Sequence, residues 1–272
     1  MPEDRELRGT AAGVPFLAQP PPTRDDAAPV VVLWHMTDPP RSETAMAAAV
    51  PLRGLDAWRV YLGLPMSGSR LPDGGLDAFL QLGYQDAVLE LFDPITRQAV
   101  QEFPAALAEL RPQLNLDHNP LALVGASAGA FVCLSLVTET DIPVAAVALI
   151  SPAIRLASVV AGNERRFDVT YPWSERSREV AARLDFVARA AEIADREIPT
   201  LFVLGDRDDR EAFHEPAEAL SEELSGRATL VRIPDLEHAL AEEPGLDPAP
   251  QTEQAAQVDA ALVEWLRREL AT

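Results

Sequence analysis

The sequence predicts an α/β domain with a mostly parallel sheet and helices on both faces of it. Short apolar runs rich in β-branched residues recur along the chain, most clearly at residues 29–34 and 144–150. Runs that are apolar throughout are typical of strands buried on both faces. Alanine-rich or amphipathic segments separate these runs, and strands that alternate with helices usually form parallel sheets.

The expected elements can be placed in order along the chain. Residues 13–17 fit a short edge strand within an otherwise loose, proline-rich N-terminal arm. We predict strands at residues 29–34, 58–62, 121–124, 144–150, 199–204 and 228–233. We predict helices at residues 42–51, within 90–110, and at 130–137, 217–224 and 251–270. The segment between the strands at 144–150 and 199–204 is polar and arginine-rich, which favours two or three short helices.

These elements divide the chain into four segments. Residues 1–29 form the arm, and residues 30–152 form the first part of the α/β core. Residues 153–197 form a small helical cap, or lid, and residues 198–272 complete the core. A chain of 272 residues that is 47% hydrophobic is long enough for one large core of this kind.

Composition excludes several classes of function. The formal net charge is -20, which disfavours nucleic acid or an anionic membrane as a partner. The basic side chains other than histidine are all arginine, so a lysine Schiff base and a P-loop are excluded. The single cysteine, Cys133, rules out an internal disulfide and a cysteine-rich metal site. We therefore expect no metal and no cofactor.

The chain shows no targeting or membrane-spanning pattern. Residues 1–6 are charged and are not followed by a long apolar stretch, so a signal peptide is not expected. No window approaches the roughly 20 apolar residues of a membrane span. The expected location is the cytoplasm, and the sequence leaves the oligomeric state open.

The most informative motif is Gly125-Ala126-Ser127-Ala128-Gly129, which lies between an apolar strand and an apolar helix. In that context, G-x-S-x-G forms a tight turn that exposes the serine hydroxyl at the tip of the strand. The two glycines remove side chains that would collide in the turn. The motif predicts Ser127 as a nucleophile and the Ala128 amide as a donor to a developing oxyanion.

A serine nucleophile needs a base, and the base needs an acid that orients it, in the chain order serine, acid, histidine. His238, which follows the last predicted strand, is the only histidine of the four in the right order and place. Asp206, Asp208 and Asp209 follow the strand at 199–204. Asp208 is the preferred acid and Asp206 the second choice.

The second oxyanion donor should come from the loop after the early strand at 29–34, which begins at His35. The amide of Thr37 is preferred, and that of Met36 is the alternative. His35 is also expected to contact substrate.

Together, the turn at Ser127, the His35 loop, the Asp208 turn and the late His238 resemble the α/β-hydrolase superfamily across roughly residues 30–270. The style of the segment at 199–240 is most similar to bacterial esterases, dienelactone hydrolases and prolyl-oligopeptidase catalytic domains. The resemblance implies an eight-stranded sheet and acyl transfer through an acyl-serine. Met36 departs from the pattern, because glycine commonly occupies that position.

The leading hypothesis is a serine hydrolase of the carboxylesterase type that cleaves a small ester. Tyr171 and Trp173 of the cap offer an aromatic wall for the acyl or alcohol group, although Trp173 could equally anchor the cap to the core. A thioesterase, or an acyltransferase or cyclase of a biosynthetic pathway, shares the acyl-serine step and is the second hypothesis. A catalytically silent hydrolase fold that binds a ligand is the third.

Overall fold

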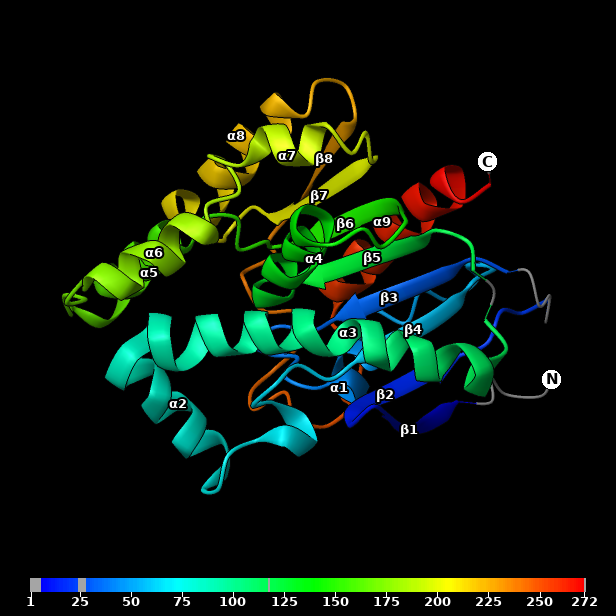
Figure 1. The fold of residues 1–272 in the computed structure, drawn as a ribbon, viewed down its shortest axis with the longest axis horizontal. Helices are drawn as coiled ribbons and strands as arrows, with labels where there is room; N and C mark the ends of the chain where they lie inside the picture. The colour runs from blue at the N-terminus through cyan, green and yellow to red at the C-terminus, as the bar shows by residue number, and fades with distance from the viewer. Residues whose placement is uncertain (1–5, 24–27, 117, 272) are drawn as a thin grey trace.

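The computed structural model describes residues 6–23, 28–116 and 118–271, and its central feature is an eight-stranded sheet (Figure 1). The strand order is β1-β2-β4-β3-β5-β6-β7-β8, and pairing is parallel from β4 through to β8. The six parallel strands are β3 (Val30–Trp34), β4 (Trp58–Leu62), β5 (Leu121–Ala126), β6 (Val144–Ile150), β7 (Thr200–Gly205) and β8 (Ala228–Ile233). The predicted mostly parallel sheet is therefore confirmed.

The N-terminal segment contains the strand predicted at residues 13–17, but that strand lies inside the sheet edge, next to β1, and not in a loose arm. β1 (Leu7–Ala11) and β2 (Val14–Gln19) form an antiparallel hairpin, and β2 pairs antiparallel with β4. Ala12 and Gly13 at the turn both have positive φ, of 47° and 82°, as two-residue hairpin turns require. β2 is almost wholly buried, and both strands of the hairpin are part of the central sheet. Residues 1–5 and 24–27 of the predicted arm lie outside the described residues.

Helices cover both faces of the sheet and divide the core in two. On one face, α3 (Asp93–Leu114), α4 (Ala128–Glu139) and α8 (Glu215–Glu223) bury their apolar sides. On the other face, α1 (Glu43–Ala49) and α9 (Glu253–Glu269) do the same. Alternate residues of β3 serve the two cores, with Val30, Val32 and Trp34 facing α3 and α4. This two-sided burial explains why the strands are apolar throughout.

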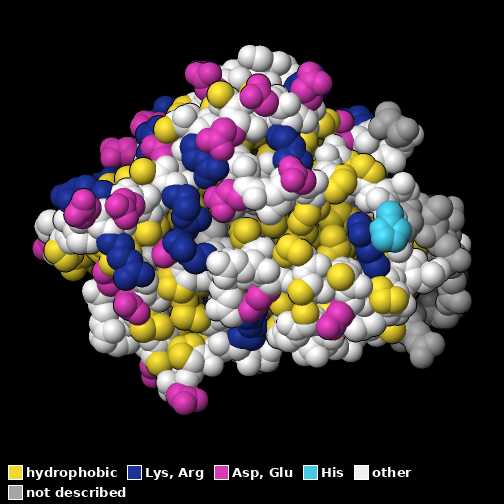
Figure 2. Space-filling view, in the orientation of Figure 1, with side chains coloured by type: hydrophobic (Ala, Val, Ile, Leu, Met, Phe, Trp, Pro, Cys, Tyr) yellow, Lys and Arg dark blue, Asp and Glu magenta, His cyan; other side chains and the backbone are white. Residues whose placement is uncertain are grey.

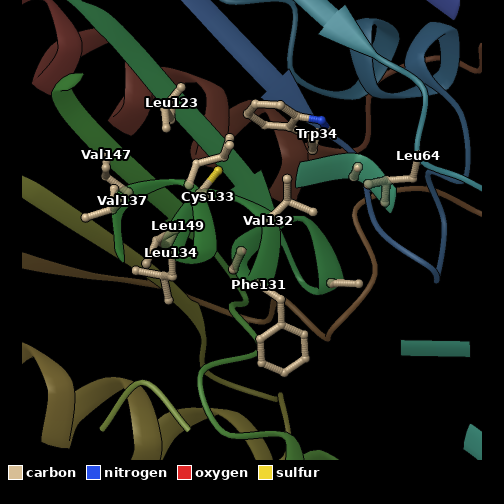
Figure 3. Packing of buried hydrophobic residues seen from close by; sticks show 14 of the residues in the cluster. Trp34, Leu64, Leu123, Phe131, Val132, Cys133, Leu134, Val137, Val147 and Leu149 are labelled. Atoms are coloured by element: carbon tan, nitrogen blue, oxygen red, sulfur yellow. The ribbon is translucent and has the colours of Figure 1, made fainter. Parts of the chain in front are cut away.

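The helix that follows Ser127 is the most deeply buried helix in the fold. Every residue of α4 from Ala128 to Val137 is buried. Figure 3 shows α4 side chains, among them Cys133 and Val137, packed with Leu123 and Val147 of the sheet. Burial raises the pKa of the Cys133 thiol, so this cysteine behaves as an inert core residue.

Two groups of helices extend past the carboxyl ends of the parallel strands (Figure 1). The predicted cap contains α5 (Leu156–Phe167) and α6 (Glu175–Arg183), which lie at this end, and α7 (Ala190–Ala194), which packs against α4 and α8. Before α3 lie the short helix η1 (Gly68–Arg70), α2 (Gly75–Asp86) and the π-helix η2 (Ala87–Phe92), and a second π-helix, η3 (Arg210–His214), precedes α8. Among the described residues, no helix combines the length and the apolar character needed to cross a membrane.

Candidate active site

The carboxyl ends of four parallel strands bring the predicted site residues together. Thr37 follows β3, Ser127 follows β5, Asp208 follows β7 and His238 follows β8. Ligands of open α/β sheets bind at this edge, because the loops that leave neighbouring parallel strands meet there.

Ser127 lies in the sharp turn that its sequence motif predicts. Its backbone has φ 47° and ψ -113°, a sparsely populated conformation for a residue with a side chain. A Cβ atom on Gly125 would lie 2.4 Å from the Gly129 carbonyl oxygen, and one on Gly129 would lie 2.7 Å from the Trp34 carbonyl oxygen. The two glycines therefore permit a close approach of backbone segments that any side chain would prevent.

Two hydrogen bonds link the side chains of Ser127, His238 and Asp208. His238 Nε2 lies 2.8 Å from Ser127 Oγ, and His238 Nδ1 lies 2.8 Å from Asp208 Oδ2. With the Nδ1 proton donated to the carboxylate, Nε2 is left as the acceptor for the serine hydroxyl. This arrangement can remove the hydroxyl proton as the oxygen attacks a carbonyl carbon.

The turn that carries Asp208 is fastened to the loop that carries His238. The Asp206 amide donates to the Ile233 carbonyl at 3.0 Å, and the Arg207 amide donates to the Leu236 carbonyl at 3.0 Å. A Cβ atom on Gly205 would lie only 2.3 Å from the Leu236 carbonyl oxygen, so glycine is required for this contact. The backbone thus sets the distance between acid and imidazole.

The structure distinguishes the three aspartates that the sequence left open. The Asp208 side chain is 3% exposed and contacts the imidazole. Asp206 is exposed on the turn. Asp209 caps η3 through the Ala212 amide and forms an ion pair with Arg165 at 2.9 Å. Asp208 is therefore the one of the three whose carboxylate the structure places on His238.

The charges around His238 raise the pKa of its imidazole. Burial alone lowers that pKa, but the hydrogen bond and charge of Asp208 outweigh the effect of burial. Asp38, whose carboxylate lies 4.0 Å from His238 Nε2, raises the pKa further, and the charge of Arg166 opposes this in part. The imidazolium that forms when the base accepts a proton is therefore stabilised.

Among the described residues, no hydrogen bond joins the other three histidines to Ser127 or His238. His35 is fully buried: its Nδ1–H donates to the Met36 carbonyl at 2.7 Å, and Nε2 accepts the Leu64 amide at 3.0 Å. Burial lowers the pKa of His35 to about 4, which keeps it neutral. Contrary to the expected substrate contact, its ring holds the loop after β3. His214 is buried, and its Nε2 lies 2.8 Å from the Gly205 carbonyl oxygen. His118 is exposed.

The structure separates the two candidates for the second oxyanion donor. The Met36 amide donates to the Pro40 carbonyl at 3.2 Å and its side chain is buried in the core, so that amide is not available to substrate. Among the described residues, the Thr37 amide has no hydrogen-bond partner, and Thr37 lines the adjoining cavity. Ala128 begins α4, where a backbone N–H has no acceptor within the helix and the helix dipole favours negative charge.

Arg41 fastens the Thr37 loop to the His238 loop, a role that the sequence did not reveal. Its Nε donates to the Thr37 carbonyl at 2.8 Å, and Nη1 donates to Glu243 and to the Pro244 carbonyl at 2.5 and 2.6 Å. Because guanidinium groups carry several donors in a fixed plane, one buried arginine can join both loops.

A cavity of about 250 Å³ begins beside these residues, at Thr37 and Asp38. One wall comes from α2 and η2, and the other comes from α5 and residues 169–172 of the cap. Its buried part is lined by the apolar side chains of Phe79, Leu91, Phe92 and Val160. The cavity therefore reaches from the surface to Thr37 and Asp38, and the Asp38 carboxylate lies 4.0 Å from His238 Nε2.

The two aromatic residues predicted to form a substrate wall occupy different positions. Tyr171 lines the cavity, and its hydroxyl donates to Asp86 Oδ1 at 2.5 Å. Trp173 packs edge-to-face on Tyr171 and against the core, and it does not line the cavity. Trp173 thus fits the alternative role of anchoring the cap.

Among comparisons with known proteins, only those with solved structures find matches. No family model matches the chain, and no curated protein matches it. Among solved structures, TT1662 from Thermus thermophilus superposes with a TM-score of 0.65 and 19% identity over 99% of both chains. An esterase/lipase from an uncultured bacterium gives 0.59 and 17% over 100% of this chain and 87% of that one.

Some of the similar structures are much longer than this chain. A puromycin-hydrolyzing peptidase from Mycobacterium tuberculosis gives a TM-score of 0.65 and 18% identity, and the match covers 99% of this chain but 41% of that one. At such identities the likeness shows the fold alone. The chain has the α/β-hydrolase fold, as the resemblance in its sequence implied.

Proposed function

We propose that this protein is a serine hydrolase that cleaves a small-molecule ester through an acyl-serine intermediate. The observation that carries the proposal is the pair of 2.8 Å contacts joining Ser127, His238 and Asp208. Similar structures that include esterases and peptidases support hydrolysis as the class of reaction.

In the first half of the reaction, Ser127 Oγ bonds to the ester carbonyl carbon while its proton passes to His238 Nε2. The Ala128 and Thr37 amides donate to the carbonyl oxygen as it becomes negative. The bond from carbon to the alcohol oxygen then breaks, and the imidazolium gives its proton to the leaving alcohol. Asp208 orients the imidazole and stabilises its charge throughout.

In the second half, water replaces the alcohol. His238 accepts a proton from water as the water oxygen attacks the acyl carbon, and the acid leaves when Ser127 Oγ regains a proton.

The test is turnover of p-nitrophenyl acetate and butyrate by the wild type and by Ser127→Ala. We expect a loss of at least roughly 10⁴-fold in kcat for Ser127→Ala, because removing the nucleophile removes the combined action of the three groups. Ser221→Ala is the matched control, since Ser221 lies on α8 away from the site. Undiminished turnover by Ser127→Ala, or failure of a fluorophosphonate to label Ser127, would contradict the proposal.

Amide hydrolysis is a second candidate, because acylaminoacyl and puromycin-hydrolyzing peptidases are among the similar structures. A p-nitroanilide and a p-nitrophenyl ester with the same acyl group separate the two activities. We expect the ester to react far faster, since amides need more lowering of the barrier. Equal or faster anilide turnover would favour the peptidase.

A further inference from the structure

Four large apolar side chains are exposed in the described part of the chain, and all four line the cavity beside the candidate site. Leu80 and Tyr84 belong to α2, while Phe167 ends α5 and Val169 follows it. Tyr84 is 65% exposed and Val169 is 52% exposed. We call these four residues the apolar rim. Exposed apolar side chains that form one contiguous patch mark a binding surface, whereas single scattered ones do not.

The apolar rim joins α2 to the cap across the cavity opening. The rings of Tyr84 and Phe167 meet edge-to-face, with centroids 5.9 Å apart and planes at 74°. Figure 2 shows hydrophobic side chains over the outer ends of α2 and α5, on the left of that face, with basic and acidic side chains around them. The rim is therefore an apolar border set within a charged surface.

From the rim, the apolar lining continues inward toward Thr37 and Asp38. Phe79, Leu91, Phe92 and Val160 line the buried part, and the inner end lies at Thr37 and Asp38. Since Asp38 lies 4.0 Å from His238 Nε2, a ligand in the cavity would lie next to the imidazole. This continuity favours a substrate over a protein partner as the occupant.

Several polar groups on the cavity wall have partners within the protein, and the Arg166 guanidinium lies 5.4 Å from the centre of the Phe167 ring. Asp86 Oδ1 accepts hydrogen bonds from the Val88 and Leu89 amides as well as from Tyr171 Oη, and Glu164 Oε1 accepts the Tyr171 amide at 2.7 Å. Burial and the Asp86 contact raise the pKa of Tyr171 to about 12, so its hydroxyl stays a donor. The wall that faces a ligand is mainly apolar, and Asp38, Asn163 and Arg166 are among its remaining polar groups.

We infer that the substrate carries an extended apolar group, an alkyl chain or an aromatic ring system, that fills the cavity and reaches the apolar rim. This inference rests on the proposed ester hydrolysis and specifies its substrate class. A volume of about 250 Å³ is slightly below the usual range of ~300–1,000 Å³ for small-molecule sites. A short apolar group fills the cavity. A longer group extends to the apolar rim, where the rings of Tyr84 and Phe167 cover the end of that group.

Two series of esters test the inference and show on which side of the ester bond the apolar group lies. In p-nitrophenyl alkanoates from acetate to decanoate the acyl chain grows, and in acetate esters of primary alcohols the alcohol grows. We expect kcat/KM to rise with chain length in one series, by up to about fourfold per methylene. All esters are used below the concentrations at which they aggregate.

The variant Tyr84→Ser/Phe167→Ser then removes both rings of the rim. We expect the ratio of kcat/KM for the longest ester to that for the shortest to fall about tenfold. The matched control is Gln81→Ser, because Gln81 is exposed on the same helix but does not line the cavity. Its ratio should equal that of the wild type. The ratio is independent of any loss of folded protein, since such a loss lowers both rates equally.

The outcomes separate this inference from the proposed function. Absence of Ser127-dependent turnover of any ester contradicts the proposed function itself. Ser127-dependent turnover that does not vary with length in either series, or a double variant with an unchanged ratio, overturns only the inference about the apolar group.

Discussion

The ring of Phe213 stacks on the imidazole of His238, with centroids 4.1 Å apart and planes 29° apart. Phe213 lies in the π-helix η3, which starts two residues after Asp208. The wider turn of this helix directs Phe213 at the imidazole and His214 into the core, and π-helical turns occur often at functional sites. His238 is thus held by a ring on its face and by hydrogen bonds at both nitrogens.

We predict that Phe213 is a positioning residue. Phe213→Leu should lower kcat about tenfold and leave KM nearly unchanged, because a branched aliphatic group no longer fixes the plane of the imidazole. Phe213→Tyr, which keeps the ring, should retain most of kcat. Steady-state kinetics on one ester measures both. A rise in KM without a fall in kcat would show that Phe213 contacts substrate instead.

The three aspartates of the β7 turn should differ sharply in their effect on rate. We predict that Asp208→Asn lowers kcat by roughly 10³–10⁴-fold, since an amide cannot hold the imidazole in the required tautomer or stabilise its charge. Asp206→Asn is the matched control two residues away and should stay near the wild-type rate. Comparable losses from both variants would show that the turn matters as a whole and not through one carboxylate.

Asp38 should set the pH range of activity through its charge on His238. Because that charge raises the pKa of the imidazole, Asp38→Asn should lower the pKa. The base must be neutral to act, so the acidic limb of kcat/KM should move to lower pH in the variant. Asp141→Asn is the control, since Asp141 is exposed and precedes β6 at the opposite end of the sheet. An unmoved or upward-moved limb for Asp38→Asn would contradict the account.

Much of this site could be predicted because its signals are local. The two glycines around Ser127 form a pattern of only five residues, and each apolar run marked a strand to within a residue or two at its ends. The chain order serine, acid, histidine then limited the candidates for the acid and the base to residues that follow later strands. Loops at the carboxyl ends of parallel strands lie at the same edge of the sheet, so Asp208 and His238 could be expected near Ser127.

What the sequence could not reveal depends on contacts between distant segments. Arg41 joins two loops that are 202 residues apart in the sequence. β1 was missed because three of its five positions are exposed and it shows no apolar alternation, whereas β2 overlaps the strand predicted at residues 13–17. The apolar rim was missed because α2 was not predicted and its exposed residues acquire meaning only opposite α5.

The buried imidazole of His35 should make folding sensitive to acid. Its pKa is about 4 in the folded protein and about 6.5 when unfolded, so the unfolded chain binds more protons between these values. The stability that depends on neutral His35 is complete above pH 6.5 and decreases as the pH falls toward 4, by roughly 3 kcal/mol in total. Burial is the main cause of the lowered pKa.

Urea unfolding at pH 7 and at pH 4.5 measures this effect against His35→Asn, whose amide can donate and accept as the neutral imidazole does. The variant should lose less stability than the wild type between the two pH values, because the carboxylates titrate alike in both proteins. Equal losses in the two proteins would show that His35 is not the group responsible.

The most direct test of the central claim is the intact mass of the protein during turnover of a p-nitrophenyl ester, quenched with acid within the first turnovers. The account predicts a mass increase of one acyl group, located on Ser127 by peptide mapping and absent from Ser127→Ala. Turnover without acylated protein, or acylation at another residue with Ser127 unmodified, would contradict an acyl-serine mechanism at this site.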